Sequence, residues 1–197
     1  MSVSRTKLKL VDVARQLFAK NGVENTTMND IAQASQKGRR TLYTYFKNKE
    51  EIYYAVIEAE VERLSDKMAQ VAQLDTTPEE KLVELISTHL DLVKETVSRN
   101  GNLRAVFFRD IWTVEKVRKH FDKTEMDTFL YILNEGVEQG RFDIENTALL
   151  SEIMHYCVKG LEVPYICGRL GDGENYTSSR TVVRSLITRI LRKDQDP

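Results

Sequence analysis

The chain has 197 residues, with 29 Lys and Arg against 30 Asp and Glu, and 41% of its residues are hydrophobic. Ordinary hydrophobic content and a net charge of −1 exclude a disordered chain, and nine Gly with three Pro argue against an all-β protein rich in tight turns. Two cysteines exclude a disulfide scaffold and a four-cysteine zinc site. No apolar run has the length of a membrane span and the N-terminus has no signal-peptide pattern, so we expect a cytoplasmic protein with no membrane partner.

Basic residues concentrate at the start of the chain. Residues 1–50 hold ten Lys and Arg but four Asp and Glu, so this segment carries +6 and the remaining 147 residues carry −7. A basic segment on an acidic body suggests that the segment meets a polyanion. A solvated basic surface is the alternative interpretation.

Amphipathic periodicity predicts about nine helices and no strand, so the expected fold class is all-α. The first helix covers about 4–21 and ends at Asn21-Gly22, where both residues tolerate the left-handed conformation. Thr27, with Asp30 three residues later, starts a short second helix. Asn48 caps a longer helix that follows a third short one. The ranges expected after the second helix are about 39–46, 49–72, 78–99, 103–112, 114–139, 145–169 and 176–193.

The first three predicted helices have the order and lengths of a helix-turn-helix motif, whose second helix enters the major groove of DNA. Arginine can bond both acceptors of a guanine edge, and hydroxyls can bond bases or phosphates. A lysine at the start of the next helix suits a phosphate. The candidate double-stranded DNA contacts are Lys37, Arg39, Arg40, Thr41, Tyr43, Thr44, Tyr45 and Lys49. A small helical subdomain with solvated arginines is the alternative.

Three motifs carry a family resemblance: residues 17–22 (LFAKNG), 26–32 (TTMNDIA) and 41–51 (TLYTYFKNKEE). Over about residues 8–52 the chain resembles the TetR family of bacterial transcriptional regulators. The resemblance implies a homodimer with an N-terminal DNA-binding domain (1–48) and a helical effector-binding and dimerisation domain (49–197). It also implies a repressor that a small-molecule effector releases from a palindromic operator.

The same resemblance implies roles for single residues. Thr27 matches a helix-start threonine that contacts phosphate. Positions that can read bases or the adjacent backbone are occupied by Arg39, Arg40, Thr41 and Thr44, and positions that mostly contact phosphates by Tyr43, Tyr45 and Lys49. One departure concerns the turn, where the family often has Gly-Val-Ser and this chain has Gln36-Lys37-Gly38, so that the glycine is shifted by two residues.

The helix expected at 145–169 is apolar around much of its circumference, so it needs one partner inside the subunit and one outside. The resemblance likewise places dimerisation on the last two helices, at about 145–193, as a four-helix bundle across a two-fold axis. Burial of both helices within one monomer is the alternative.

The resemblance implies a pocket for a small molecule of unknown identity, and pockets of this kind are usually lined by aromatic and a few polar residues, such as the aromatics and the two histidines on apolar faces of this chain. Plain core packing is the alternative for the aromatics, and a hydrogen-bonded core group is the alternative for each histidine. The candidate pocket residues are His89, Phe107, Phe108, Trp112, Tyr131 and Tyr156.

Enzymatic activity has no support in the sequence. The cysteines and the scattered His89, His120 and His155 fit no metal-ligand spacing, and neither a Gly-x-Ser-x-Gly elbow nor a Gly-rich phosphate loop occurs. We therefore expect no catalytic residue, no metal and no cofactor. The alternative function is an effector-independent, architectural DNA-binding protein.

Overall fold

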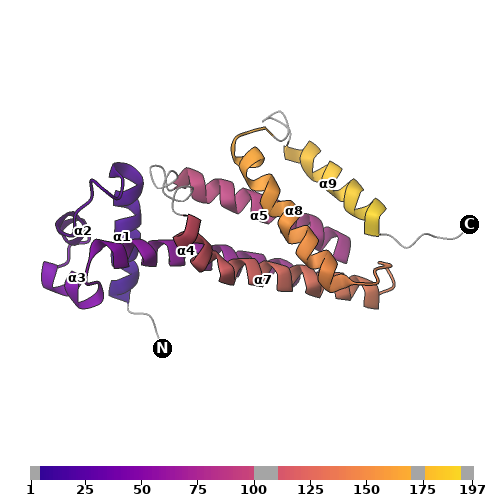
Figure 1. Cartoon of the computed structure of the whole chain (residues 1–197), viewed down its shortest axis with the longest axis horizontal. Coiled ribbons are helices and arrows are strands. Elements are labelled where there is room, and N and C mark those ends of the chain that lie inside the picture. The colour runs from indigo at the N-terminus through magenta and orange to yellow at the C-terminus, as the bar shows by residue number, and fades with distance from the viewer. Residues whose placement is uncertain (1–4, 100–110, 170–175, 192–197) are drawn as a thin grey trace, which may run out of the picture. The chain divides into compact units, whose positions relative to one another are not determined.

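The computed structural model describes residues 5–99, 111–169 and 176–191, and within these ranges the chain consists of α-helices joined by turns and short loops (Figure 1). The eight helices found there confirm the all-α prediction. The helix expected at 103–112 lies largely outside the described residues. None of the described helices is both long enough and apolar enough to span a membrane.

The described residues form two compact units. The first comes from Met1–Arg63 and Glu95–Arg118, and the second from Leu64–Lys94 and Lys119–Pro197. Three long helices, α4 (Lys49–Ala72), α5 (Pro78–Arg99) and α7 (Ile111–Glu138), contribute residues to both units. A boundary near residue 48 therefore stays a sequence prediction, and the two units are described separately below.

In the first unit, α1 (Arg5–Asn21), α2 (Met28–Ala34) and α3 (Arg39–Tyr45) pack together with the start of α4 (Figure 1). Each helix buries one apolar stripe, as its periodicity predicts. The fully buried side chains include Leu10 and Phe18 of α1, Ile31 of α2 and Leu42 of α3. The ring of Phe18 meets that of Tyr53 of α4 edge-on, with centroids 6.4 Å apart.

The turn between α2 and α3 contains the left-handed residue that a sharp reversal requires, but that residue is not a glycine. Gln36 has φ 56°, whereas Gly38 has φ −62° and serves as the N-cap of α3. The displaced glycine therefore leaves the left-handed position to a residue with a Cβ, which costs about 1 kcal/mol.

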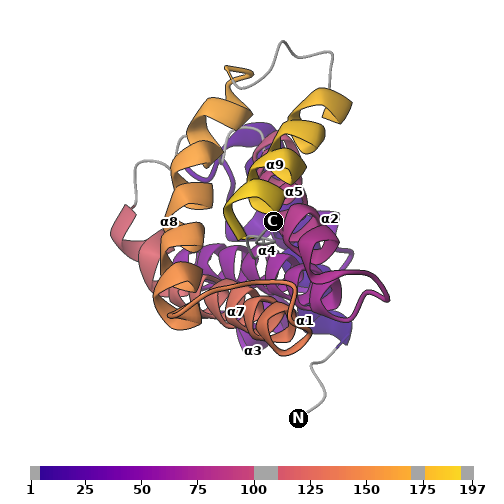
Figure 2. The ribbon, with the colours of Figure 1, turned by 90° about the vertical axis from the view of Figure 1, so that its right-hand side faces the viewer.

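The second unit contains most of α5, α7 (Ile111–Glu138), α8 (Thr147–Ile166) and α9 (Tyr176–Leu191), with α8 in orange and α9 in yellow in Figure 2. Its core is formed by large apolar side chains that are almost completely buried: Leu82, Leu85, Phe121, Phe129, Ile132 and Leu133. Gly136 lies directly against the Phe142 ring. A Cβ atom built on Gly136 would be 2.0 Å from ring atom Cδ2, which is too close for any side chain. The end of α7 can therefore pack against this ring only because residue 136 lacks a side chain.

Candidate nucleic-acid interface and the buried polar clusters

The N-terminus of α2 is fixed by a reciprocal capping box. Thr27 Oγ1 accepts a hydrogen bond from Asp30 N at 3.2 Å, and the Asp30 carboxylate accepts from Thr27 N at 2.8 Å and from Thr27 Oγ1 at 2.7 Å. The side-chain and backbone hydrogen bonds from Thr27 lower the pKa of Asp30 below its usual value. The cap that the sequence predicts is thus present, and it orients the first turn of α2.

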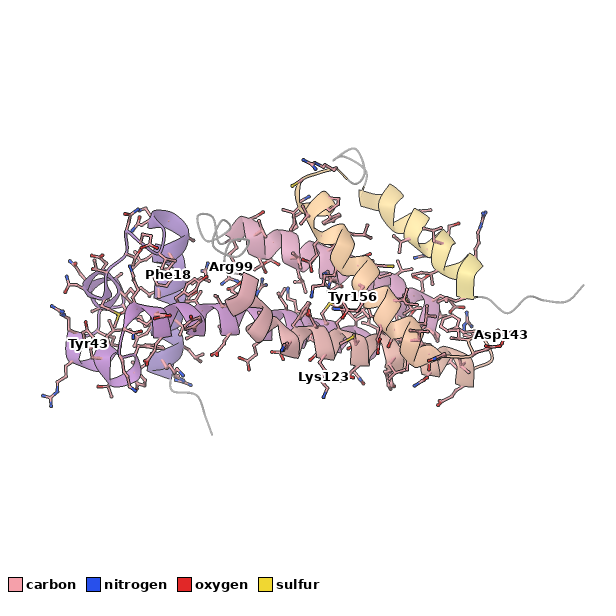
Figure 3. The ribbon with its side chains drawn as sticks, viewed as in Figure 1. Phe18, Tyr43, Arg99, Lys123, Asp143 and Tyr156 are labelled. Carbon is pink, nitrogen blue, oxygen red and sulfur yellow. The ribbon has the colours of Figure 1, made fainter. Side chains whose placement is uncertain are left out.

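Helix α3 has one buried face and one exposed basic face. Leu42, with Phe46 just past the helix end, turns inward, while Arg39, Arg40 and Tyr43 are exposed (Figure 3). Thr44 is exposed as well, and its hydroxyl donates to the backbone oxygen of Arg40 at 2.9 Å. Lys37, Thr41 and Tyr45 are half-buried. This helix is therefore held by its apolar side and presents two guanidinium groups to solvent.

Lys49 has a different environment from the other candidate DNA contacts. It is half-buried, and its Nζ donates to the backbone oxygens of Val23 at 2.6 Å and of Glu24 at 3.2 Å. Both acceptors lie in the loop between α1 and α2. The structure therefore joins the first residue of α4 to this loop.

A second polar feature of the first unit is a set of ion pairs around Glu60, which is 4% exposed. Three arginines have a nitrogen close to its carboxylate: Arg15 Nε of α1 at 3.8 Å, Arg63 Nη2 of α4 at 3.7 Å and Arg99 Nη2 of α5 at 3.9 Å. Arg99 also lies 3.9 Å from Asp12 of α1. This network connects α1, α4 and the last turn of α5.

The second unit contains a buried, hydrogen-bonded cluster of histidine and glutamate side chains. His89 Nδ1 of α5 lies 2.5 Å from Glu125 Oε1 of α7, and its Nε2 lies 3.1 Å from Glu162 Oε1 of α8. The other oxygen of Glu125 accepts from His155 Nδ1 of α8 at 2.6 Å. His89, Glu125 and His155 are at most 1% exposed, so this cluster links three helices away from solvent.

The opposite charges of the His89, Glu125 and Glu162 side chains stabilise each other. Burial by itself would lower the pKa of His89, but hydrogen bonds and charges from Glu125 and Glu162 outweigh it and raise this pKa to about 9. Burial would raise the pKa of Glu125, but the hydrogen bonds from His155 and His89 outweigh it and lower that pKa. His89 is therefore a cation at neutral pH. Within the described ranges, no set of His, Cys, Asp and Glu side chains is arranged to hold a metal ion.

Comparison with known proteins places these features in a family. The profile of the bacterial regulatory proteins of the tetR family matches residues 10–56, which include α2, α3 and the start of α4. The transcriptional regulator QacR of Staphylococcus aureus is 25% identical over 79% of this chain and 83% of its own length. Residues 10–56 are therefore a DNA-binding domain of the tetR family.

Solved structures of transcriptional regulators share the fold. One from Cytophaga hutchinsonii, 21% identical, superposes with a TM-score of 0.74 over 93% of this chain and 97% of its own. The regulator FadR of Bacillus subtilis, solved in complex with stearoyl-CoA and 19% identical, superposes with a TM-score of 0.61 over 92% and 97%. This chain is a DNA-binding transcriptional regulator, as are the relatives that match its sequence.

Among the candidate pocket residues of this regulator, the structure describes the side chains of His89, Tyr131 and Tyr156, which have different environments. His89 is in the interior, but Tyr131 is 53% exposed and Tyr156 is 64% exposed (Figure 3). These two tyrosines lie on the surface of α7 and α8 because their helical positions face away from the core. Phe107 and Phe108 lie outside the described residues, as does the side chain of Trp112. The sequence analysis also missed Glu125 and Glu162, which are the partners of His89.

Helix α8 of the regulator has a second, outward apolar stripe. Leu149, Ile153, Tyr156 and Val163 follow at spacings of four, three and seven residues and are 52%, 49%, 64% and 48% exposed. Such spacing places them along one side of the helix. Leu186 of α9 is 53% exposed. The inner side of α8, by contrast, carries the buried His155 and Val158.

Proposed function

We propose that this regulator is a homodimeric repressor that binds a palindromic operator and is released from it by a small-molecule effector. The observation that carries the proposal is the exposed pair Arg39 and Arg40 on α3, a helix whose opposite face is anchored by Leu42. A bacterial repressor of this kind acts in the cytoplasm, where the DNA is.

In this proposal α3 enters the major groove and its arginines read guanine in each half-site. Lys37, Thr41 and Thr44 contact bases or nearby backbone, and Tyr43 and Tyr45 contact phosphates. We expect Thr27, the N-cap of α2, to contact a phosphate, as the family resemblance implies.

The outward stripe of α8 supports the homodimer. Four large apolar side chains in line are more than a solvated helix surface usually exposes, and self-association would bury them. A two-fold axis through this stripe would pair two copies of α8 and α9, and a symmetric dimer matches a palindrome.

The effector is proposed to bind in the second unit and to act by preferring the DNA-free conformation. Support comes from proteins that share the fold, since FadR of Bacillus subtilis was solved with stearoyl-CoA and one from Saccharomonospora viridis with choline. The chemical class of this chain's own effector follows from neither.

The first test selects bound duplexes from a random DNA pool at about 150 mM salt, where non-specific phosphate binding is weak. We expect convergence on a palindrome with a guanine in each half-site. Binding without convergence would favour an architectural protein, and thermal stabilisation by a compound from a metabolite panel would favour an effector-responsive one.

The second test substitutes the proposed reading residues. Arg39→Ala and Arg40→Ala should each cost about 1–3 kcal/mol of operator binding and relax the preference at one position. Arg189→Ala, which removes an exposed arginine of α9, is the matched control and should leave the preference unchanged. Wild-type sequence preference in both α3 variants would refute the assignment.

The dimer is tested by placing a charge on the stripe. Ile153→Glu should convert the dimer to a monomer in sedimentation velocity, because a buried carboxylate at a two-fold interface meets its own copy. The control is Leu74→Glu, since Leu74 is also an exposed aliphatic side chain of the second unit, with 43% of its surface exposed, and lies outside the stripe of α8. A dimeric Ile153→Glu protein would show that α8 is not the interface.

A further inference from the structure

Lys49, the first residue of α4, donates its hydrogen bonds to backbone carbonyls of the same chain. Lys49 Nζ donates to Val23 O at 2.6 Å and to Glu24 O at 3.2 Å, residues that lie 26 and 25 positions earlier in the chain. An ammonium group has three N–H donors, and two of them are directed at these carbonyls. The shorter bond is partly buried, so water replaces it poorly.

The loop that accepts these bonds determines where α2 begins. It leaves α1 through Gly22, which has φ +84°, and closes with Thr26 Oγ1 donating to Gly22 O at 2.8 Å. Thr26 is fully buried, and the next residue, Thr27, is the N-cap of α2. The Val23 and Glu24 carbonyls stand in the middle of this loop, so a donor that holds them also holds the cap.

The resemblance assigns this lysine a different task, the contact with a DNA phosphate. Two of the three N–H donors of Lys49 are already directed at these carbonyls and the residue is half-buried, so only the third donor is left for a phosphate. Lys47, two residues earlier, is exposed and is therefore the better placed lysine for a phosphate contact.

We propose that Lys49 is a positioning residue, which fixes the α1–α2 loop and thereby the start of α2 relative to α4, and that it does not bind a phosphate. The proposal rests on the proposed operator binding and specifies how α4 takes part in it. A displacement of the first turn of α4 then moves the loop and the Thr27 cap with it, so the DNA-binding helices respond to α4 through a direct hydrogen bond.

Salt dependence separates the two roles. The logarithm of the operator association constant falls linearly with the logarithm of salt concentration, with a slope of about −0.9 for each neutralised phosphate. Operator affinities of wild type, Lys49→Met and the matched control Lys47→Met, which removes the same charge nearby, are measured by fluorescence anisotropy from about 50 to 200 mM salt.

We expect Lys49→Met to weaken operator binding about tenfold at every salt concentration while its slope equals that of wild type, because the lost residue positions the loop and releases no counterion. A slope reduced by about 0.9 would overturn the proposal in favour of a phosphate contact. Unchanged affinity and slope would overturn it as well.

Amide hydrogen exchange without DNA provides an independent readout. In Lys49→Met the amides of Asn25 to Asp30 should exchange faster than in wild type, whereas Lys47→Met should match wild type. Unchanged exchange in Lys49→Met would overturn the proposal. Because no operator is needed, this measurement still decides on Lys49 if the selection finds no operator and the proposed function fails.

A second variant covers the case that Lys49→Met does not fold. Lys49→Gln keeps an N–H donor and loses the charge, so its exchange rates should lie between those of wild type and Lys49→Met, and its salt slope should equal that of wild type. Rates identical to wild type together with a reduced slope would again indicate a phosphate contact.

Discussion

The buried charge on His89 makes an alkaline loss of stability the most specific prediction from the structure. The pKa of His89 is about 9 in the folded chain, against 6.5 for an ordinary histidine, which stands for the unfolded state. The folded state therefore binds a proton more tightly than the unfolded state does. The resulting stabilisation is fully present below about pH 6.5 and disappears as the pH rises through about 9.

The magnitude follows from this difference between the two states. One pKa unit corresponds to 1.36 kcal/mol, so the His89 contribution to the free energy of unfolding should fall by about 3 kcal/mol between pH 6 and pH 9. The steepest part, at about pH 8, should have a slope of about 1 kcal/mol per pH unit, since almost one proton is released on unfolding there. Glu125 acts in the opposite range, because its lowered pKa gives a stabilisation that is lost only as the pH falls through that pKa.

The assay is urea denaturation followed by circular dichroism at half-unit steps from pH 6 to pH 9.5. The reference is His89→Gln, which lacks the titrating group. The pH dependence of its free energy of unfolding is subtracted from that of wild type, which removes the contribution of all other groups. A difference curve that is flat over this range would refute the conclusion that His89 is held as a cation. In Glu162→Gln, which removes one of the two carboxylates bonded to His89, the alkaline midpoint should move to lower pH.

Substitutions at three further positions test local features by thermal or chemical denaturation. Gly136→Ala should destabilise the chain by about 1–3 kcal/mol, because the new methyl group would overlap the Phe142 ring; equal stability would show that the ring moves freely. Thr27→Ala removes the side-chain acceptor of the capping box and should cost about 1 kcal/mol, whereas Thr27→Ser should retain most of the stability. Gln36→Gly should be neutral or stabilise by up to about 1 kcal/mol, since glycine adopts φ 56° without strain; a clear loss would mean that the Gln36 side chain itself is needed.

Local signals in the sequence predicted the DNA-binding helices well. The capping box at Thr27 and Asp30 and the left-handed Gly22 are where the sequence places them, because caps and helix ends depend on residues within four positions of each other. The buried face of α3 follows from the spacing of Leu42 and Phe46 in the same way. The left-handed Gln36 was not predicted, because the pattern contains no glycine at that position.

Contacts between residues far apart in the sequence could not be predicted from local sequence patterns. Lys49 bonds a loop 25 residues away, and nothing near it in the sequence distinguishes this from a lysine facing solvent. Glu125 did leave a signal, since it lies four residues from both Phe121 and Phe129 on the buried side of α7. A carboxylate on such a face needs cationic partners, and His89 and His155 on apolar faces were the available ones.

The outward tyrosines show the limit of composition as a guide. Tyr131 and Tyr156 were grouped with the other aromatics because their residue type suits a pocket, yet their positions on α7 and α8 face solvent. On α8 the position of Tyr156 in line with Leu149, Ile153 and Val163 was the better signal. The side of a helix on which an aromatic lies decides its environment more than its type does.

The two kinds of contact along α1 give its attachment to α4 an uneven stiffness. Near its C-terminal end, Phe18 packs against Tyr53, and a gap of 0.5–1 Å there would forfeit about a quarter to a half of the dispersion attraction. One turn earlier, Arg15 is held to Glu60 at 3.8 Å, and a 1 Å increase in this separation lowers the Coulomb attraction by only about a fifth. A small separation of α1 from α4 should therefore weaken the Phe18–Tyr53 contact proportionally more than the Arg15–Glu60 ion pair, so that the ion pair continues to link the two helices after the ring contact has been lost.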